Sequence, residues 1–143
     1  MPLYEVLTTH GALDDARRAE LAAGITAIHV EETGAPASFV HVMFTEVPPA
    51  AAYTGGAPST PVVVRGQIRA GRPPEVRRAI LERTSALCVA VARVPVGDVL
   101  VAVLDVPASW AMEGGRIFPD PDPAAERTFV ELAADDRPPA QDT

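Results

Sequence analysis

The chain contains the same unit twice. When the sequence is shifted by 59 residues, positions 2–48 align without gaps on positions 61–107, and nine of the 47 pairs are identical. Three of these identities are prolines, at positions 2 and 61, 36 and 95, and 48 and 107. Prolines that recur at the same element boundaries are hard to obtain by chance, so we infer an internal duplication with a unit of about 59 residues.

Each unit has the pattern of a strand, a helix and a second strand. Residues 3–8 and 62–69 are rich in strand-forming side chains, and residues 39–46 and 99–105 form a second such run that ends at Val-Pro. Between the two runs, apolar residues recur at the spacing of a helix face: Leu21, Ile25 and Ile28 in the first unit, and Val76, Ile80, Leu87 and Val91 in the second. Asp14 is a predicted N-cap, and Pro73 and Pro74 suit the first turn of the second helix.

Two such units predict an α/β (α+β) fold. The strands within a unit should be parallel and joined by a right-handed crossover. Together they give a four-stranded mixed sheet with both helices on one face. The other face would carry Val, Ile and Phe side chains, and a chain of 143 residues has no third layer to cover them. We therefore expect oligomerisation.

Two segments lie outside this predicted repeat. Residues 49–60 have the composition of a flexible loop of small residues that includes Tyr53. The segment from Pro119 onward is acidic and proline-rich, and a short helix is expected near residues 124–134. We expect one tandem domain at residues 1–118, with units at about 2–48 and 61–107, followed by a solvated tail at residues 119–143.

Composition excludes several classes of protein. The formal net charge of −7 argues against binding to nucleic acid through phosphate contacts. Cys88 is the only cysteine, so it forms no internal disulfide and builds no thiolate metal site. The longest apolar runs span six residues, far fewer than the roughly 20 of a membrane helix, and no secretion signal is visible. A cytoplasmic protein with no membrane partner and no metal is expected.

The motifs of common enzyme classes are absent, including the P-loop, the dinucleotide-binding glycine motif, the serine-hydrolase elbow, HExxH and CxxC. The candidate residues that remain are a proline at position 2 that begins a strand, two arginines at a strand end, a histidine within a helix, and a glutamate in a loop. In the chain they are Pro2, Arg69, Arg72, His29 and Glu113.

These residues resemble those of a known family. The start MPLY, the duplicated unit, the segment IRAGR (68–72) and the segment VPASW followed by MEGGR (106–116) are similar to the tautomerase superfamily, with a fold like that of macrophage migration inhibitory factor. The most similar group is that of cis-3-chloroacrylic acid dehalogenase, in which two 4-oxalocrotonate tautomerase units are fused. The resemblance runs from Pro2 to about Phe118.

The resemblance implies a role for each candidate. In this family the initiator methionine is removed and the secondary amine of the exposed proline, here Pro2, is catalytic. Such an amine has an ordinary pKa of about 7.7–8.0, close enough to neutrality for it to act as an acid or a base. Arg69 and Arg72 would hold the carboxylate of the substrate, His29 would help to bind it, and Glu113 would activate water. The resemblance also implies a homotrimer and no cofactor.

One departure affects the predicted reaction. The dehalogenases carry a tyrosine that assists the attacking water, and the matching position here is Ala102, so Tyr4 or Tyr53 would have to replace it. We therefore favour a tautomerase acting on a 2-keto or enol acid. The alternatives are a hydratase or dehalogenase of short unsaturated acids such as cis-3-chloroacrylate, and a trimeric domain that binds small acids without catalysis.

Each candidate also has an ordinary structural explanation. Proline is tolerated at the start of an edge strand, and arginines at the entrance to a helix are often solvated. His29 could be a half-buried structural histidine, and Glu113 could form a surface ion pair with Arg116.

Overall fold

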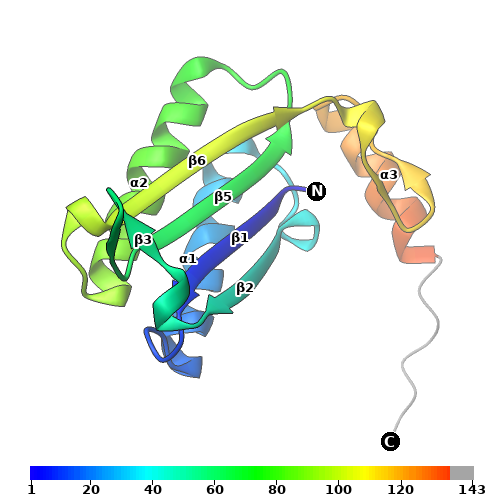
Figure 1. The fold of residues 1–143 in the computed structure, drawn as a ribbon. Coiled ribbons are helices and arrows are strands. Elements are labelled where there is room, and N and C mark those ends of the chain that lie inside the picture. The colour runs from blue at the N-terminus through cyan, green and yellow to red at the C-terminus, as the bar shows by residue number, and fades with distance from the viewer. Residues whose placement is uncertain (136–143) are drawn as a thin grey trace, which may run out of the picture.

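The computed structural model describes residues 1–135 and contains the predicted four-stranded mixed sheet. The strands run in the order β2–β1–β5–β6, with both long helices on one face (Figure 1). Within each unit the strands pair in parallel, and the two units meet through the antiparallel pair β1 and β5. The strands are β1 (Leu3–Thr9), β2 (His41–Val47), β5 (Val62–Arg69) and β6 (Val99–Val106).

The two long helices occupy equivalent positions in the two repeat units. Helix α1 spans Asp15–Thr33 and helix α2 spans Pro74–Ala92, so both of their ends are separated by 59 positions. The Asp14 carboxylate accepts a hydrogen bond from the Arg17 backbone N–H at 2.8 Å, which confirms the predicted N-cap. Where the helices cross, a Cβ on Gly24 would lie 2.5 Å from Cδ2 of Leu87, so the glycine allows the close approach.

The predicted start of the second strand is wrong by two residues. Phe39 lies in a single 3₁₀ turn, η1 (Ala37–Phe39), and β2 begins at His41; the second unit has the matching turn η3 (Val96–Asp98). The Phe39 N–H donates to the carbonyl of Pro36 at 3.0 Å, which closes the turn before the chain can join the sheet. Phe39 is therefore free to pack at the end of the molecule.

The duplication extends further than the sequence analysis predicted. Residues 49–60 are not a loop outside the repeat, because they form a 3₁₀ turn and a small hairpin that recur 59 positions later. The turn of each hairpin is a Gly-Gly pair, at positions 55–56 and 114–115, and all four glycines have positive φ angles of 58–81°. Two-residue hairpins require that conformation, and glycine adopts it without strain. The elements are η2 (Pro49–Ala51), β3 (Tyr53–Thr54) and β4 (Ala57–Pro58), matched by η4 (Ala108–Trp110), β7 (Met112–Glu113) and β8 (Arg116–Ile117).

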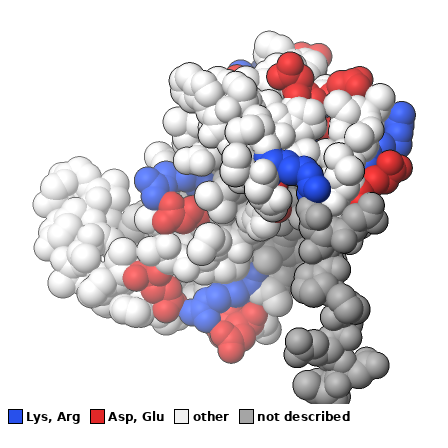
Figure 2. All heavy atoms as spheres, turned by 90° about the vertical axis from the view of Figure 1, so that its right-hand side faces the viewer, with Lys and Arg blue, Asp and Glu red and all other residues white. Residues whose placement is uncertain are grey.

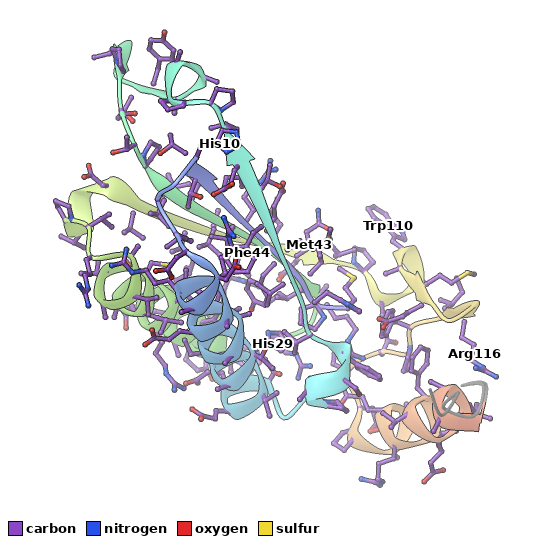
Figure 3. The ribbon with its side chains drawn as sticks, turned by 90° about the horizontal axis from the view of Figure 1, so that it is seen from below. His10, His29, Met43, Phe44, Trp110 and Arg116 are labelled. Carbon is purple, nitrogen blue, oxygen red and sulfur yellow. The ribbon has the colours of Figure 1, made fainter. Side chains whose placement is uncertain are left out.

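The two faces of the sheet differ in composition. On β2, Phe44 points towards α1 and packs on the core, whereas Met43 points the other way and is 61% exposed (Figure 3). The prediction that Val, Ile and Phe occupy the open face is wrong, because alternation places most of these residues under the helices. The open face carries other apolar side chains, such as Leu100 and Leu104, and the exposed Glu5–Arg65 ion pair.

The segment after Phe118 packs against the end of the sheet. It contains the predicted short helix, α3 (Pro123–Asp135), but the prediction of a solvated tail is wrong for this part, since Phe129 is only 7% exposed. It packs in an apolar cluster at the end of the sheet, made of Met1, Phe39, Ala108, Phe118 and Phe129. Residues 136–143 of the predicted tail lie outside the described residues. Within residues 1–135, the helices are too short or too polar to cross a membrane.

Candidate functional site

The sheet topology brings the candidate residues to one end of the molecule. Because β1 and β5 are antiparallel, with Leu3 opposite Gln67, the start of β1 lies beside the end of β5. Pro2 and Arg69 are therefore neighbouring positions. Figure 1 shows the amino terminus at this end, near α3 and the β7–β8 hairpin.

A carboxylate lies directly against the amino terminus. The Met1 ammonium donates to Glu113 Oε2 at 2.7 Å, and His41 Nε2 donates to Oε1 of the same side chain at 2.8 Å. Burial lowers the pKa of the Met1 amine, the contact with Glu113 partly offsets this, and the positive charge of Arg69 lowers the pKa further. Burial raises the pKa of Glu113, but the bonds from Met1 and His41 outweigh it, so the net pKa is lowered. Amine and carboxylate thus form an ion pair.

The two arginines lie on the other side of the amine. The Arg69 side chain is 2% exposed, and its guanidinium donates to the carbonyl of Pro119 at 3.0 Å and to the Glu126 carboxylate. Arg72 donates to the carbonyl of Thr33 at 2.9 Å and reaches Glu126 at 3.6 Å. Burial and the charge of Arg69 lower the pKa of Arg72, and Glu126 opposes that effect. Two buried like charges therefore share one carboxylate.

His29 lies beneath the arginines. It is 2% exposed, and its Nδ1 forms a hydrogen bond of 2.8 Å with the hydroxyl of Tyr4. Burial, with the charges of Arg72 and Arg69, lowers the pKa of His29 to about 3, so the ring is neutral at physiological pH. His29 is therefore packed like a structural histidine of the core, within the electric field of both arginines.

Three phenylalanine rings pack together next to the site. The rings of Phe118 and Phe129 are stacked with centroids 4.8 Å apart, and Phe39 meets each of them edge-on. Arg69 lies over the Phe118 ring at 5.7 Å, within the range of a cation–π contact. Charged groups in such a setting are poorly solvated and interact more strongly than they would in water.

Two residues of this arrangement had no signal in the sequence. His41 begins β2 and its repeat partner is Leu100, so the duplication gives no hint of a charged contact there. Glu126 belongs to the segment that was expected to be solvated. A weak signal was available for the helix that carries it, because apolar residues at positions 125, 129, 130 and 133 recur at the spacing of a helix face.

The tyrosines do not take the place left by Ala102. The Tyr4 hydroxyl is bound to His29, and Tyr53 lies in β3, at the opposite end of the sheet from the amino terminus (Figure 1). Ala102 lies in the middle of β6, opposite Arg65 of β5 and on the open face of the sheet.

The duplicated end of the molecule lacks this chemistry. Positions that are 59 residues away from the five candidates hold a proline inside the chain, a histidine, a leucine, a cysteine and a threonine: Pro61, His10, Leu13, Cys88 and Thr54. Figure 3 shows His10 at the end remote from His29. The nitrogen of Pro61 is part of a peptide bond and has no basicity. Among residues 1–135, the combination of a free amine with the Arg69–Arg72 pair therefore occurs at one end, although the backbone repeats.

Among the described residues, neither sign of charge dominates the surface of this end. Figure 2 views it directly and shows cationic and anionic side chains interspersed on the surface. Among residues 1–135, no three His, Cys, Asp or Glu side chains gather as potential metal ligands. The positive charge that could attract an anion is the buried pair Arg69 and Arg72.

The duplicated fold and a buried terminal amine flanked by arginines define a tautomerase-type protein. A family profile described as "Putative oxalocrotonate tautomerase enzyme" matches residues 1–134, and the chain belongs to this family of the tautomerase superfamily.

Solved structures show the same relationship. A protein described as native Ps01740 is 52% identical, with a TM-score of 0.76, covering 78% of this chain and 99% of that one. N1, a member of the cis-3-chloroacrylic acid dehalogenase family, is 26% identical with a TM-score of 0.84, covering 93% and 99%. A fused 4-oxalocrotonate tautomerase solved as an asymmetric trimer is 27% identical with a TM-score of 0.75, covering 80% and 94%. No curated protein sequence matches this chain.

Proposed function

We propose that this protein is a tautomerase that moves a proton between oxygen and carbon of a 2-keto or enol carboxylic acid. The base is the secondary amine of Pro2, which becomes free once Met1 is removed. The observation that carries the proposal is the meeting, at one buried end of the sheet, of the amino terminus, the Arg69–Arg72 pair and Glu113.

The groups suit that reaction. The neutral amine takes the proton from the enol hydroxyl and returns it to the adjacent carbon, so that a C–H bond and a C=O bond replace the O–H bond and the C=C bond. Arg69 and Arg72 bind the carboxylate and stabilise the negative charge that develops on the conjugated oxygen. A neutral His29 can hydrogen-bond the substrate without adding a third positive charge.

The position of Met1 supports the idea that its removal is needed. Met1 is 9% exposed and packs in the cluster with Phe39, Phe118 and Phe129. Its loss leaves a space the size of one residue beside the new Pro2 amine, bordered by the phenylalanine rings. Processing would therefore create both the catalytic amine and room for a small substrate.

The proposal is tested with protein whose Pro2 amino terminus has been verified by intact mass. We expect it to catalyse the ketonisation of 2-hydroxymuconate or of enol phenylpyruvate, followed by ultraviolet absorbance. Pro2→Ala keeps a free amine but makes it primary and less constrained, so activity should collapse. Equal activity in both proteins would remove Pro2 from the mechanism.

A second candidate is hydration or hydrolytic dehalogenation of a short unsaturated acid. The observation that favours it is the Glu113 carboxylate, which lies 2.7 Å from the terminal nitrogen and could take a proton from water. Pro2 would then be cationic and would deliver a proton to carbon. Turnover of cis-3-chloroacrylate or an acetylenic acid, with no ketonisation of enols, would favour this candidate.

We further propose that the chain assembles as a homotrimer through the open face of its sheet. The support is the exposed apolar side chains of β2 and β6 and the trimeric assembly of a fused relative. If the trimer forms and binds small acids, but neither reaction is catalysed by the verified protein, a binding role without catalysis remains. Light scattering with mass determination tests the assembly.

A further inference from the structure

We infer that Glu126 is an internal carboxylate that occupies the substrate-carboxylate site and must be displaced before a substrate binds. This inference rests on the proposed function, because it takes Arg69 and Arg72 as the residues that hold a carboxylate. Glu126 makes the contacts that an acidic substrate would make, and it comes from α3, beyond the duplicated unit.

The guanidinium of Arg69 has both terminal nitrogens engaged by this one segment. One donates to the carbonyl of Pro119 and the other to the carboxylate of Glu126. A carboxylate ligand that binds in a fork needs two parallel donors of the same guanidinium. A substrate that binds Arg69 through both terminal nitrogens therefore competes with Pro119 and Glu126 for them.

Burial argues that this contact is more than a surface ion pair. The side chains of Arg69 and Glu126 are 2% and 9% exposed, so both charges are largely removed from water. Without a partner the two arginines would be buried like charges at considerable cost. Glu126 neutralises one of them while the site is empty, and a substrate carboxylate would do the same while it is bound.

The helix that carries Glu126 also fills the space next to the amine. Phe129, one turn further along α3, packs on Phe118 and Phe39, and Val130 lines two hollows. One hollow borders Arg72 and the other borders Glu113. Helix α3 thus contributes side chains both to the hollow at Arg72 and to the hollow at Glu113.

This arrangement predicts how affinity changes when the internal carboxylate is neutralised. The apparent dissociation constant of a ligand equals the intrinsic constant divided by the fraction of molecules in which the site is open. Glu126→Gln keeps the shape but replaces the ion pair with a weaker bond from the cationic guanidinium to a neutral amide oxygen, and we expect propanoate to bind about tenfold more tightly.

In the experiment, propanoate is added to protein whose Pro2 terminus has been verified. Binding is followed by NMR through the Nε–Hε signals of the arginines. Asp120→Asn is the matched control, since it removes the same charge from an exposed position of the same segment. We expect tighter binding in Glu126→Gln alone. Equal or weaker binding in Glu126→Gln, relative to the parent and Asp120→Asn, would overturn the inference.

A second measurement needs no substitution. In the protein without substitutions and with a verified Pro2 terminus, backbone hydrogen exchange in α3 should become faster when propanoate saturates the site. The exchange rates in α1 and α2 should stay unchanged. Unchanged exchange in α3 under saturation would contradict displacement. If Glu126→Gln binds propanoate more tightly but the verified protein catalyses no ketonisation, the proposed function is contradicted and this inference is not. Suppose instead that ketonisation depends on Pro2, and that Glu126→Gln changes neither ketonisation nor the affinity for propanoate. That result would contradict this inference and leave the proposed function intact.

Discussion

The contact between Glu113 and the amino terminus makes a quantitative prediction. A carboxylate at 2.7 Å favours the charged form of the amine, so Glu113→Gln should lower the pKa of the amino terminus. A hydrogen bond between charged groups contributes about 1.5–3 kcal/mol. Because the Glu113 side chain is 33% exposed, we take the lower end of that range. At about 1.4 kcal/mol per pH unit, the pKa should fall by about one unit.

The assay is the pH dependence of the ¹⁵N chemical shift of the amino-terminal nitrogen, first in protein that retains Met1 and then in protein that begins at Pro2. Glu46→Gln is a suitable control, because Glu46 also contacts a histidine and an arginine, His10 and Arg18, but at the opposite end of β2. It should leave the amine unchanged. A pKa that stays the same or rises in Glu113→Gln would refute the reasoning.

The same variant separates the two proposed reactions. If Pro2 acts as a base, lowering the pKa of its amine leaves it neutral over a wider range, and the acidic limb of kcat/KM should move to lower pH. If Pro2 acts as an acid and Glu113 activates water, turnover should be lost together with the carboxylate. Measuring both reactions over pH with one protein preparation therefore tests the roles of Pro2 and Glu113 together.

Four further predictions concern binding and stability. Arg72→Ala should weaken the binding of small carboxylates, measured by the same NMR titration, and an unchanged affinity would remove Arg72 from the site. Gly66→Ala places a Cβ 2.6 Å from the ring of Tyr4, and urea unfolding should show a loss of about 1–3 kcal/mol from overpacking; no loss would mean that the ring can shift freely. Arg93 has a left-handed backbone conformation (φ 56°) at the end of α2, and Arg93→Gly removes the strain of that conformation, so the free energy of unfolding should rise by up to about 1 kcal/mol. A decrease would show that the contacts of the Arg93 side chain contribute more to stability than its backbone strain costs. His29 has a pKa of about 3 when folded and 6.5 as its ordinary value, so unfolding takes up a proton between these pH values and stability should fall as pH drops below 6.5. His29→Gln should flatten this dependence by up to about 1.4 kcal/mol per pH unit, and an identical slope in both proteins would contradict the buried neutral ring.

Periodicity and proline positions were enough to predict the central fold. The ungapped offset located both helices and the parallel strands of each unit, because each unit must bury the same helix face on the same sheet. The hairpins were missed because only Ala52 and the two glycines of the first hairpin are identical to their partners, and short polar turns have no apolar period. The burial of α3 was missed because an acidic, proline-rich segment is typical of solvated chain.

The site was predictable to the extent that its residues belong to the strand ends. Antiparallel pairing of the two first strands is sufficient to bring Pro2 next to Arg69. The contacts of His41 and Glu126 depend on where two distant segments pack, and nothing in their local sequence indicates it. The family resemblance supplied expected roles for single residues, whereas the structure added the partners that govern their charge.

The repeated backbone also has a consequence for the order of the chain. A gene that began at codon 61, with the present first unit joined after the second, would encode the same arrangement of strands and helices. Its free amine would then belong to Pro61, and the proline now at the start would be locked in a peptide bond. Such a circular permutant would transfer the basic nitrogen to an end that holds His10 and Leu13 where this chain has Arg69 and Arg72. Chain order alone therefore selects which end of a nearly symmetric scaffold has a free nitrogen, and the side chains around it have diverged to match.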